Sequence, residues 1–444
     1  MHSFHYQNGR LHCEDVDLKA LAAEHGTPLY VYSAGTILDH YRRLDEALAG
    51  LDHQIQFAVK ANSNIGVLNL LSREGCGFDI VSGGELFRVL KAGGNPGRCS
   101  FAGVGKTRDE IAYALEHGIY SFNVESEAEL AAIDTVAGQM GTTAPVALRV
   151  NPNVDARTHK YISTGLSENK FGIEHDTIPD VCRRAAALPH VRLRGIQMHI
   201  GSQLTSIDPF VQAVTKMTPL VESLRDDHDI EFFSVGGGLG IVYEDSLASG
   251  RRDWWAARSQ GGASPATVND YADALVSLLA PLGLKILLEP GRLIVGNAGV
   301  LLSEVLYEKT GEVKTFRIVD AGMNDLIRPA LYQGHHEIVP VDEPASPEAR
   351  AVDVVGPICE TGDFFAQNRE LPALQAGDVI ALMSAGAYGF VMASNYNSRP
   401  FPAEILVSGG QSHVIRERQS HEDLVRGESI PGQAALKSPP SLSP

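Results

Sequence analysis

The sequence predicts an α/β fold in which a (β/α)8 barrel is followed by a second, mostly β domain. Three observations support this prediction. Short apolar segments alternate with segments of helical periodicity, polar residues and glycines stand where the apolar segments end, and the pattern changes after about residue 295. Alternation of strands and helices is typical of a parallel sheet. Eight such repeats within about 240 residues fit a barrel.

Eight short apolar runs are the predicted strands of the barrel. They occupy residues 55–59, 77–81, 99–102, 121–124, 146–150, 195–200, 232–235 and 286–288. Segments with helical spacing lie between them, at residues 64–74, 84–92, 107–117, 126–140, 177–188, 209–225 and 268–282. A doubly wound open sheet is the alternative, but its glycine-rich loop usually follows the first strand. Here the glycine run, residues 236–238, follows the seventh.

A different pattern follows the barrel. Short runs at residues 299–305, 315–319, 351–355, 378–383 and 403–407 are separated by Gly, Pro and Asp, which are strand and turn signals. We expect the barrel to span residues 33–295, and a β domain (a Greek-key-like barrel or a sandwich) to combine residues 1–32 with 296–420. The N-terminal part is expected to add a strand or two to this domain. Residues 421–444 form a tail whose Pro/Ser-rich end is predicted to be disordered.

A long insert at residues 249–265 interrupts the barrel pattern. It contains the pair Trp254 and Trp255. The sequence leaves open whether these rings pack on the protein's own surface or against a partner.

Composition narrows the class of function. The chain has 444 residues and a net charge of −17, which argues against nucleic-acid and acidic-membrane partners. No apolar stretch is long enough to span a bilayer. Residues 1–6 lack a basic segment followed by an apolar one, which predicts a cytoplasmic protein. The five cysteines are scattered without a CxxC pair, so we expect reduced thiols, no disulfide framework and no metal site.

Lys60 is the most informative single residue. It closes the apolar run at residues 56–59, so an ammonium group stands at the end of a predicted buried strand. Burial lowers the pKa of an amine, and a neutral amine can attack a carbonyl to form an imine. A strand-end lysine that reaches solvent is the alternative on this segment alone. In a barrel the carboxyl ends of all strands meet on one face, where the active site lies.

The other strand ends predict a cofactor. The run Gly236, Gly237 and Gly238 allows backbone N–H groups to approach a phosphate closely, and barrels often bind phosphate after strands seven and eight. An imine-forming lysine beside a phosphate site indicates pyridoxal 5'-phosphate. Glu289, at the end of the eighth strand, is the candidate partner of its pyridine nitrogen. His199 is the candidate to stack on its ring, although such a histidine alone is more often a core residue.

The chain resembles the fold-type III pyridoxal phosphate decarboxylases, whose barrel is alanine racemase-like, and within them the diaminopimelate decarboxylases. The resemblance runs from about residue 30 to 407. The matching segments are Phe-Ala-Val-Lys-Ala-Asn at 57–62, Asn-Lys-Phe-Gly at 169–172, His-Ile-Gly-Ser-Gln at 199–203, Gly-Gly-Gly at 236–238, Glu-Pro-Gly-Arg at 289–292, the run at 320–329, Gly-Pro-Ile-Cys-Glu-Thr-Gly-Asp at 356–363 and Gly-Ala-Tyr-Gly at 386–389.

The resemblance implies a role for each matching residue. Lys60 would hold the cofactor as an imine, and Glu289 would pair with its pyridinium. The residues implied around the ring, the phosphate and the adjoining substrate site are His199, Ser202, Gly236, Gly237, Gly238, Gly291 and Arg292. The residues implied to bind substrate are Arg292, Arg328, Tyr332, Glu360 and Tyr388, of which Tyr388 would also touch the cofactor. Cys359 would protonate the carbanion that remains when CO2 leaves.

The implied activity is decarboxylation of meso-2,6-diaminopimelate to L-lysine and CO2, the last step of lysine biosynthesis. The resemblance also implies a homodimer, because in this family the segment around Cys359 comes from the other subunit. Two alternatives stay open at this point. One is a related decarboxylase acting on ornithine, arginine or carboxynorspermidine. The other is a non-catalytic protein that binds pyridoxal phosphate.

Overall fold

The computed structural model describes residues 1–155, 170–259, 265–344 and 348–431. Three expectations fall wholly or partly outside these ranges. They are the disordered end of the tail, the first residue of the Asn-Lys-Phe-Gly segment at 169–172, and residues 260–264 of the insert.

Eight parallel strands close into a barrel, which confirms the predicted fold class. They are β5 (His53–Ala58), β6 (Gly77–Ile80), β7 (Cys99–Phe101), β8 (Ser121–Val124), β9 (Ala144–Asn151), β11 (Val191–Met198), β12 (Phe232–Ser234) and β13 (Lys285–Leu288). The pairs β8–β9 and β13–β5 complete the circle, and the short β10 (Ile173–Glu174) adds to β9. These strands are continuous apolar runs because both faces of a parallel sheet are buried. All four residues of β8, for example, are buried.

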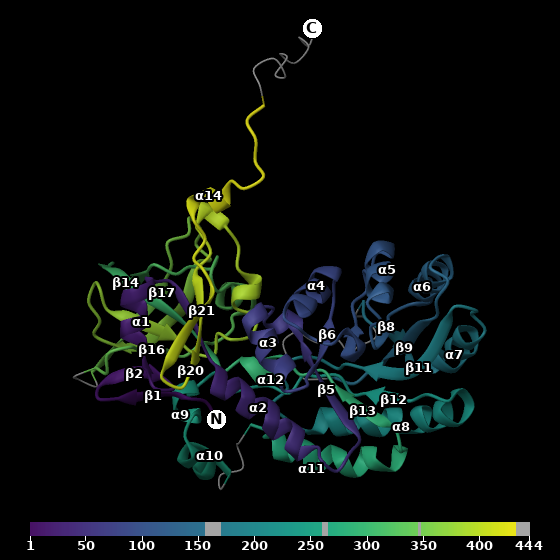
Figure 1. Ribbon diagram of the computed structural model, residues 1–444. Helices are drawn as coiled ribbons and strands as arrows, with labels where there is room; N and C mark the ends of the chain where they lie inside the picture. Colours follow the sequence, from purple (N-terminus) through teal and green to yellow (C-terminus); the bar gives the residue numbers. More distant parts are fainter. Residues whose placement is uncertain (156–169, 260–264, 345–347, 432–444) are drawn as a thin grey trace.

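Helices surround the barrel, and Figure 1 shows α3 to α8 around its strands in the right half of the view. They are α2 (Ala34–Ala47), α3 (Ile65–Arg73), α4 (Gly83–Lys91), α5 (Arg108–Glu116), α6 (Glu127–Gln139), α7 (Ile178–Ala186), α8 (Asp208–His228) and α11 (Val268–Leu279). Side-chain caps fix where several of them begin. The Ser126 hydroxyl accepts the N–H of Glu129 at 3.2 Å, and Thr107 forms a reciprocal capping box with Glu110.

The second domain is mostly β, as predicted. Its strands are β14 (Gly299–Thr310), β15 (Thr315–Val319), β16 (Ile338–Pro340), β17 (Ala349–Val355), β18 (Phe364–Pro372), β19 (Val379–Leu382), β20 (Ala403–Ser408) and β21 (Gln411–Arg416). With β4 (Leu29–Ser33) from the N-terminal segment, the sheet order is β18-β17-β15-β14-β4-β20-β21, and β19 pairs with both β14 and β16. The sheet is mixed, because β15 pairs with β17 and β4 with β20 in parallel.

The N-terminal segment joins this domain through one strand, β4 (Leu29–Ser33), which lies between β14 and β20. Before it, β1 (Phe4–Gln7), β2 (Arg10–Cys13) and β3 (Val16–Asp17) form a sheet of their own, followed by α1 (Leu18–His25). This small sheet, purple in Figure 1, contacts the β domain where the N–H of Leu11 donates to the carbonyl of Val341 at 2.8 Å.

The insert at residues 249–265 begins where the short helix α9 (Ser246–Ser249) ends, and it contains α10 (Arg252–Ser259). Trp254 and Trp255 contact each other edge to face, with ring centroids 5.0 Å apart. The remaining short helices are α12 (Arg292–Val295), α13 (Arg328–Tyr332) and α14 (His421–Leu424). Within the described ranges, no helix has the length and apolar character needed to cross a membrane, and no cluster of His, Cys, Asp and Glu could hold a metal ion.

Candidate active site

The carboxyl ends of three neighbouring strands bring ionisable side chains together. Lys60 lies in a single 3-10 turn, Val59–Ala61, directly after β5. Its Nζ donates a hydrogen bond to Oδ2 of Asp79, a buried residue of β6, at 2.5 Å. Glu289 follows β13 and lines the same cavity. The structure therefore places two of the predicted site residues, Lys60 and Glu289, on one face of the barrel.

The ionisation of Lys60 differs from the sequence-based prediction. Burial was expected to lower its pKa, and burial does act in that direction. The carboxylate of Asp79, with Tyr388 and Glu289, acts against it and raises the pKa of Lys60 above its ordinary value. The prediction was wrong because it took account of desolvation and not of a partner carboxylate on the next strand. The Lys60 side chain keeps 38% of its surface accessible, so its amine faces the cavity.

Glu289 is held in place by three hydrogen bonds from barrel strands. Its Oε1 accepts from Ser234 Oγ at 2.7 Å and from Asn123 Nδ2 at 3.2 Å, and its Oε2 accepts from Gln197 Nε2 at 2.9 Å. Burial and the charge of Asp79 raise the pKa of Glu289 to about 7. A positive charge placed beside this buried carboxyl group would favour its ionised form.

The glycine run after β12 packs against backbone too closely for any side chain. A Cβ on Gly237 would lie 2.2 Å from the carbonyl oxygen of Glu289, and one on Gly236 would lie 2.4 Å from that of Met198. The N–H of Gly237 donates to Nδ1 of His199 at 3.2 Å, so this ring nitrogen is an acceptor. Burial and nearby cations lower the pKa of His199 well below its ordinary value, which keeps the ring neutral.

Arg292, the first residue of α12, is buried and lines the same cavity. Its Nη1 donates to the hydroxyl of Tyr243 and its Nη2 to Oγ of Ser202 at 3.1 Å. Its guanidinium carbon is 4.8 Å from the ring centroid of Tyr388. The backbone N–H of Tyr388 donates to the carbonyl of Ala61 at 2.8 Å, which ties it to the turn that carries Lys60. Gly238 and Gly291 line this cavity as well.

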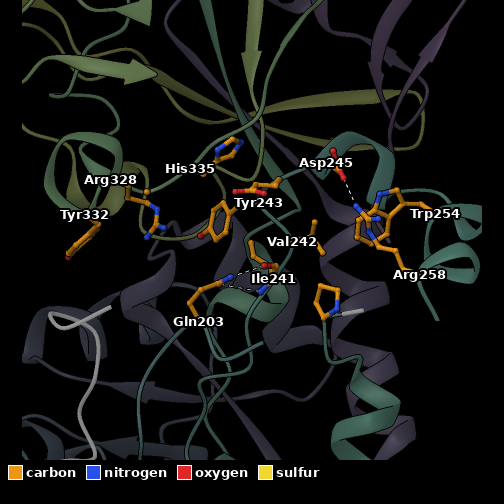
Figure 2. A pocket seen from close by; sticks show the side chains of 13 residues that line it. Gln203, Ile241, Val242, Tyr243, Asp245, Trp254, Arg258, Arg328, Tyr332 and His335 are labelled. Atoms are coloured by element: carbon orange, nitrogen blue, oxygen red, sulfur yellow. Dashed lines mark hydrogen bonds and ion pairs between the residues drawn. The ribbon is translucent and has the colours of Figure 1, made fainter. Parts of the chain in front are cut away.

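Arg328 and Tyr332 belong to a neighbouring cavity of about 590 Å³ (Figure 2). Both come from α13. Figure 2 shows Arg328 and Tyr332 at one end and Trp254 and Arg258 of the insert at the other, with Tyr243 between them. The sequence left open where the two tryptophan rings pack. In the structure Trp254 forms part of the wall of this cavity.

Cys359 and Glu360 are not brought to Lys60 within one chain. Both are exposed, and they line neither of these two cavities. The N–H of Cys359 donates to Oδ1 of Asn397 at 2.8 Å. The other four cysteines are buried, and all five are free thiols.

The sequence prediction missed residues that shape the site, among them Asp79 and Gln197. The sequence does place Arg149 near the end of the predicted strand at residues 146–150, and so on the active-site face, but assigns it no role. Arg149 on β9 is buried, lines the cavity and donates to Oε1 of Glu125 at 2.6 Å. The second oxygen of Glu125 accepts the N–H of Gly172 at 2.8 Å. A usable signal was present, because each of these side chains is a polar residue in or at the end of an apolar strand.

Comparison with known proteins decides the family. Residues 34–296 match the sequence model described as "Pyridoxal-dependent decarboxylase, pyridoxal binding domain". Over 431 residues the chain is 51% identical to the diaminopimelate decarboxylase of Pseudomonas aeruginosa, covering 97% of this chain and 99% of the relative. The chain belongs to the diaminopimelate decarboxylase family.

Solved structures of this family have the same fold. The diaminopimelate decarboxylase of Helicobacter pylori, complexed with L-lysine, superposes with a TM-score of 0.85 at 41% identity, over 92% of this chain and 98% of that one. The enzyme from M. jannaschii, in co-complex with L-lysine, gives a TM-score of 0.88 at 36% identity, over 97% and 98%.

The cavity of this diaminopimelate decarboxylase family member fits pyridoxal phosphate chemically. Among the described residues that line this cavity, three have a buried polar atom without a hydrogen-bond partner: Asp79 (Oδ1), Gln197 (Oε1) and Arg292 (Nε). Buried polar atoms are rarely left so, and a polar group that binds there relieves the cost. Gly238 and Gly291, which have no side chain to fill the space, line the cavity beside the buried Arg292. An amine, a cradle for an anion and a buried carboxyl group are thus all present.

Proposed function

We propose that this protein decarboxylates meso-2,6-diaminopimelate at its D-configured centre and releases L-lysine and CO2, the last step of lysine biosynthesis. The observation that carries the proposal is the meeting of Lys60, Glu289 and Arg292 in one cavity of a pyridoxal-binding barrel. Sequence identity of 50% and 51% to two diaminopimelate decarboxylases, over 97% of this chain, supports the choice of substrate.

The residues around Lys60 would hold the cofactor. Lys60 would bind its aldehyde through Nζ, His199 would pack against its ring, and Glu289 would pair with its pyridine nitrogen. The residues that would surround its phosphate are Ser202, Gly236, Gly237, Gly238, Gly291 and Arg292. When bound, pyridoxal phosphate withdraws electrons from the substrate carbon that loses its carboxylate. Glu289 supports this because a carboxylate stabilises the protonated pyridine nitrogen.

The substrate is recognised through its charges. Arg292, Arg328 and Tyr332 bind carboxylate oxygens, for which the guanidinium fork is suited. Tyr388, whose ring lies against Arg292 and lines the same cavity as Lys60, would contact both cofactor and substrate. Burial of Arg292 excludes water from its hydrogen bonds and strengthens them.

A second copy of the chain completes the site. Cys359 and Glu360 are exposed and apart from both cavities, so we propose that a homodimer brings them to the Lys60 of the other copy. There the Sγ of Cys359 delivers a proton to the carbon that has lost CO2, and Glu360 binds the distal ammonium. We also propose that the enzyme works in the cytoplasm, a reducing compartment that suits a chain whose five cysteines are all free thiols.

The test is CO2 release by purified protein with added pyridoxal phosphate, with lysine detected by mass. Diaminopimelate, ornithine and arginine are compared, and Lys60→Ala is the inactive control. Lysine and CO2 from diaminopimelate alone are expected, with both lost in Lys60→Ala. Turnover of ornithine or arginine instead would overturn the substrate assignment, and full activity of Lys60→Ala would overturn the proposed chemistry.

A further inference from the structure

Arg328 is anchored by a buried histidine of the β domain. Its Nε donates a hydrogen bond to Nε2 of His336 at 3.3 Å. His336 is fully buried and lies two positions before the first residue of β16, so the sheet fixes its place. On its other side Arg328 lines the cavity of Figure 2. The guanidinium therefore has one edge tied to the protein and another toward the cavity.

His336 can act toward Arg328 only as an acceptor. Its Nδ1 lies 2.8 Å from the carbonyl oxygen of Met383. A carbonyl oxygen accepts and cannot donate, so Nδ1 carries the proton and Nε2 carries a lone pair. Burial and the charge of Arg328 lower the pKa of His336 to about 3. The ring thus stays neutral and does not repel the guanidinium.

Tyr243 completes the support. Its ring centroid lies 5.1 Å from the guanidinium carbon of Arg328 and 5.8 Å from that of Arg292, and Figure 2 shows it beside Arg328. His336 packs edge-on against the same ring, with centroids 5.3 Å apart. An aromatic face attracts cations, so Tyr243 separates two buried like charges and holds both.

We propose that His336 is a positioning residue for substrate recognition: it ties up the Nε–H of Arg328 and leaves only the Nη1/Nη2 edge to bind a carboxylate end-on. This inference rests on the proposed function, in which Arg328 binds a substrate carboxylate. Without the histidine acceptor the guanidinium can turn and offer its Nε edge as well. Orientation is then lost, and a carboxylate binds less tightly in the geometry that the reaction needs.

A matched pair of variants tests the role. In His336→Asn the amide can still reach Met383, but it no longer extends to the Nε2 position. In His336→Gln the longer amide reaches that position and can accept from Arg328. We expect His336→Asn to raise KM for diaminopimelate about tenfold with kcat changed much less, and His336→Gln to restore KM to within about threefold of wild type.

A double-mutant cycle separates positioning from general structural support. In an Arg328→Lys background, which lacks the guanidinium, His336→Asn should change KM by no more than about twofold. Cofactor absorbance and thermal midpoint, measured on every variant, report whether the barrel is intact. If His336→Asn fails to fold, His336→Gln decides. Its KM must stay close to that of its own parent in both backgrounds, and a KM raised equally in the wild-type and Arg328→Lys backgrounds would overturn the proposal.

Three outcomes would overturn the proposal. They are an unchanged KM in folded His336→Asn, an equally raised KM in His336→Gln, and fully additive effects in the cycle. The wild-type protein is measured first, so that failure of the proposed function can be distinguished from failure of the role proposed for His336. Absence of diaminopimelate turnover in the wild type removes the function itself, whereas normal wild-type turnover with a wild-type KM in His336→Asn removes only the role of His336.

Discussion

The Nζ atom of Lys60 lies 2.5 Å from Oδ2 of Asp79, so the amine after β5 is paired with a carboxylate from β6. Asp79 is completely buried, whereas Lys60 faces the cavity. The pair reverses the effect of burial on the amine and keeps it charged. Attack on an aldehyde needs a neutral amine, so Asp79 influences how readily the protein takes up its cofactor.

Asp79→Asn should speed cofactor uptake near neutral pH. The amide keeps the size of the side chain but has no charge, so burial then lowers the pKa of Lys60 and a larger fraction of the amine is neutral. We expect cofactor-free Asp79→Asn to bind pyridoxal phosphate about tenfold faster than wild type near pH 7. The rise of this rate with pH should also occur at lower pH than in wild type. Visible absorbance after rapid mixing measures this. Asp109→Asn, an exposed position on α5, is the control and should match wild type. An unaltered pH profile in Asp79→Asn contradicts the prediction.

Glu289→Gln should change how stability depends on pH in cofactor-free protein. The pKa of Glu289 is raised to about 7, so between its ordinary pKa and about 7 the folded protein binds a proton that the unfolded chain has released. Stability from this group is therefore present at low pH and is lost as pH rises toward 7. Glutamine removes the dependence, so the thermal midpoint of Glu289→Gln should fall less than that of wild type over this range.

The control for this comparison is Glu24→Gln on α1, where the glutamate side chain is 70% exposed. Its midpoint should follow the wild-type curve. Parallel curves for wild type and Glu289→Gln would show that the buried carboxyl does not take up the proton. With cofactor bound, Glu289→Gln should also lower kcat about a hundredfold, because an amide cannot stabilise a positive pyridine nitrogen as a carboxylate does.

Gly237→Ala should weaken cofactor binding and lower stability. The new Cβ would lie 2.2 Å from the backbone oxygen of Glu289, and backbone cannot move aside as a flexible side chain can. We expect a loss of about 1–3 kcal/mol in unfolding free energy, as for overpacking elsewhere, and a Kd for pyridoxal phosphate raised at least about tenfold. Denaturant titration and absorbance titration measure the two. Gly410→Ala, with no atom within 4 Å of its Cβ, should behave as wild type.

A mixture of two inactive variants tests the shared site. Lys60→Ala lacks the amine, and Cys359→Ala lacks the proton donor. If each site takes Lys60 from one copy and Cys359 from the other, mixed dimers contain one intact site, and random exchange restores about a quarter of wild-type activity. Activity is measured after co-refolding and again at high dilution. No recovery, although sedimentation shows mixed dimers, would mean that both residues act within one chain.

Local signals in the sequence were enough for the fold. Apolar runs such as the one that became β8, with a capping serine at the start of α6, predicted strands and helices to within a few residues. These features depend on side-chain periodicity and on hydrogen bonds within a few residues, which the sequence contains directly. The extra strands β18 and β21 were missed, because half-exposed hairpin strands of a β domain carry a weaker apolar signal.

The sequence by itself determined the barrel, the β domain and the amine at Lys60. Only the tertiary structure decided that Asp79 pairs with this amine and that His336 accepts a hydrogen bond from Arg328. It also decided that Cys359 lines neither of the two cavities. The reason is physical. Burial of an apolar run can be read from its own residues, whereas the charge of a buried group depends on which partners the packing brings within hydrogen-bonding distance from elsewhere in the chain.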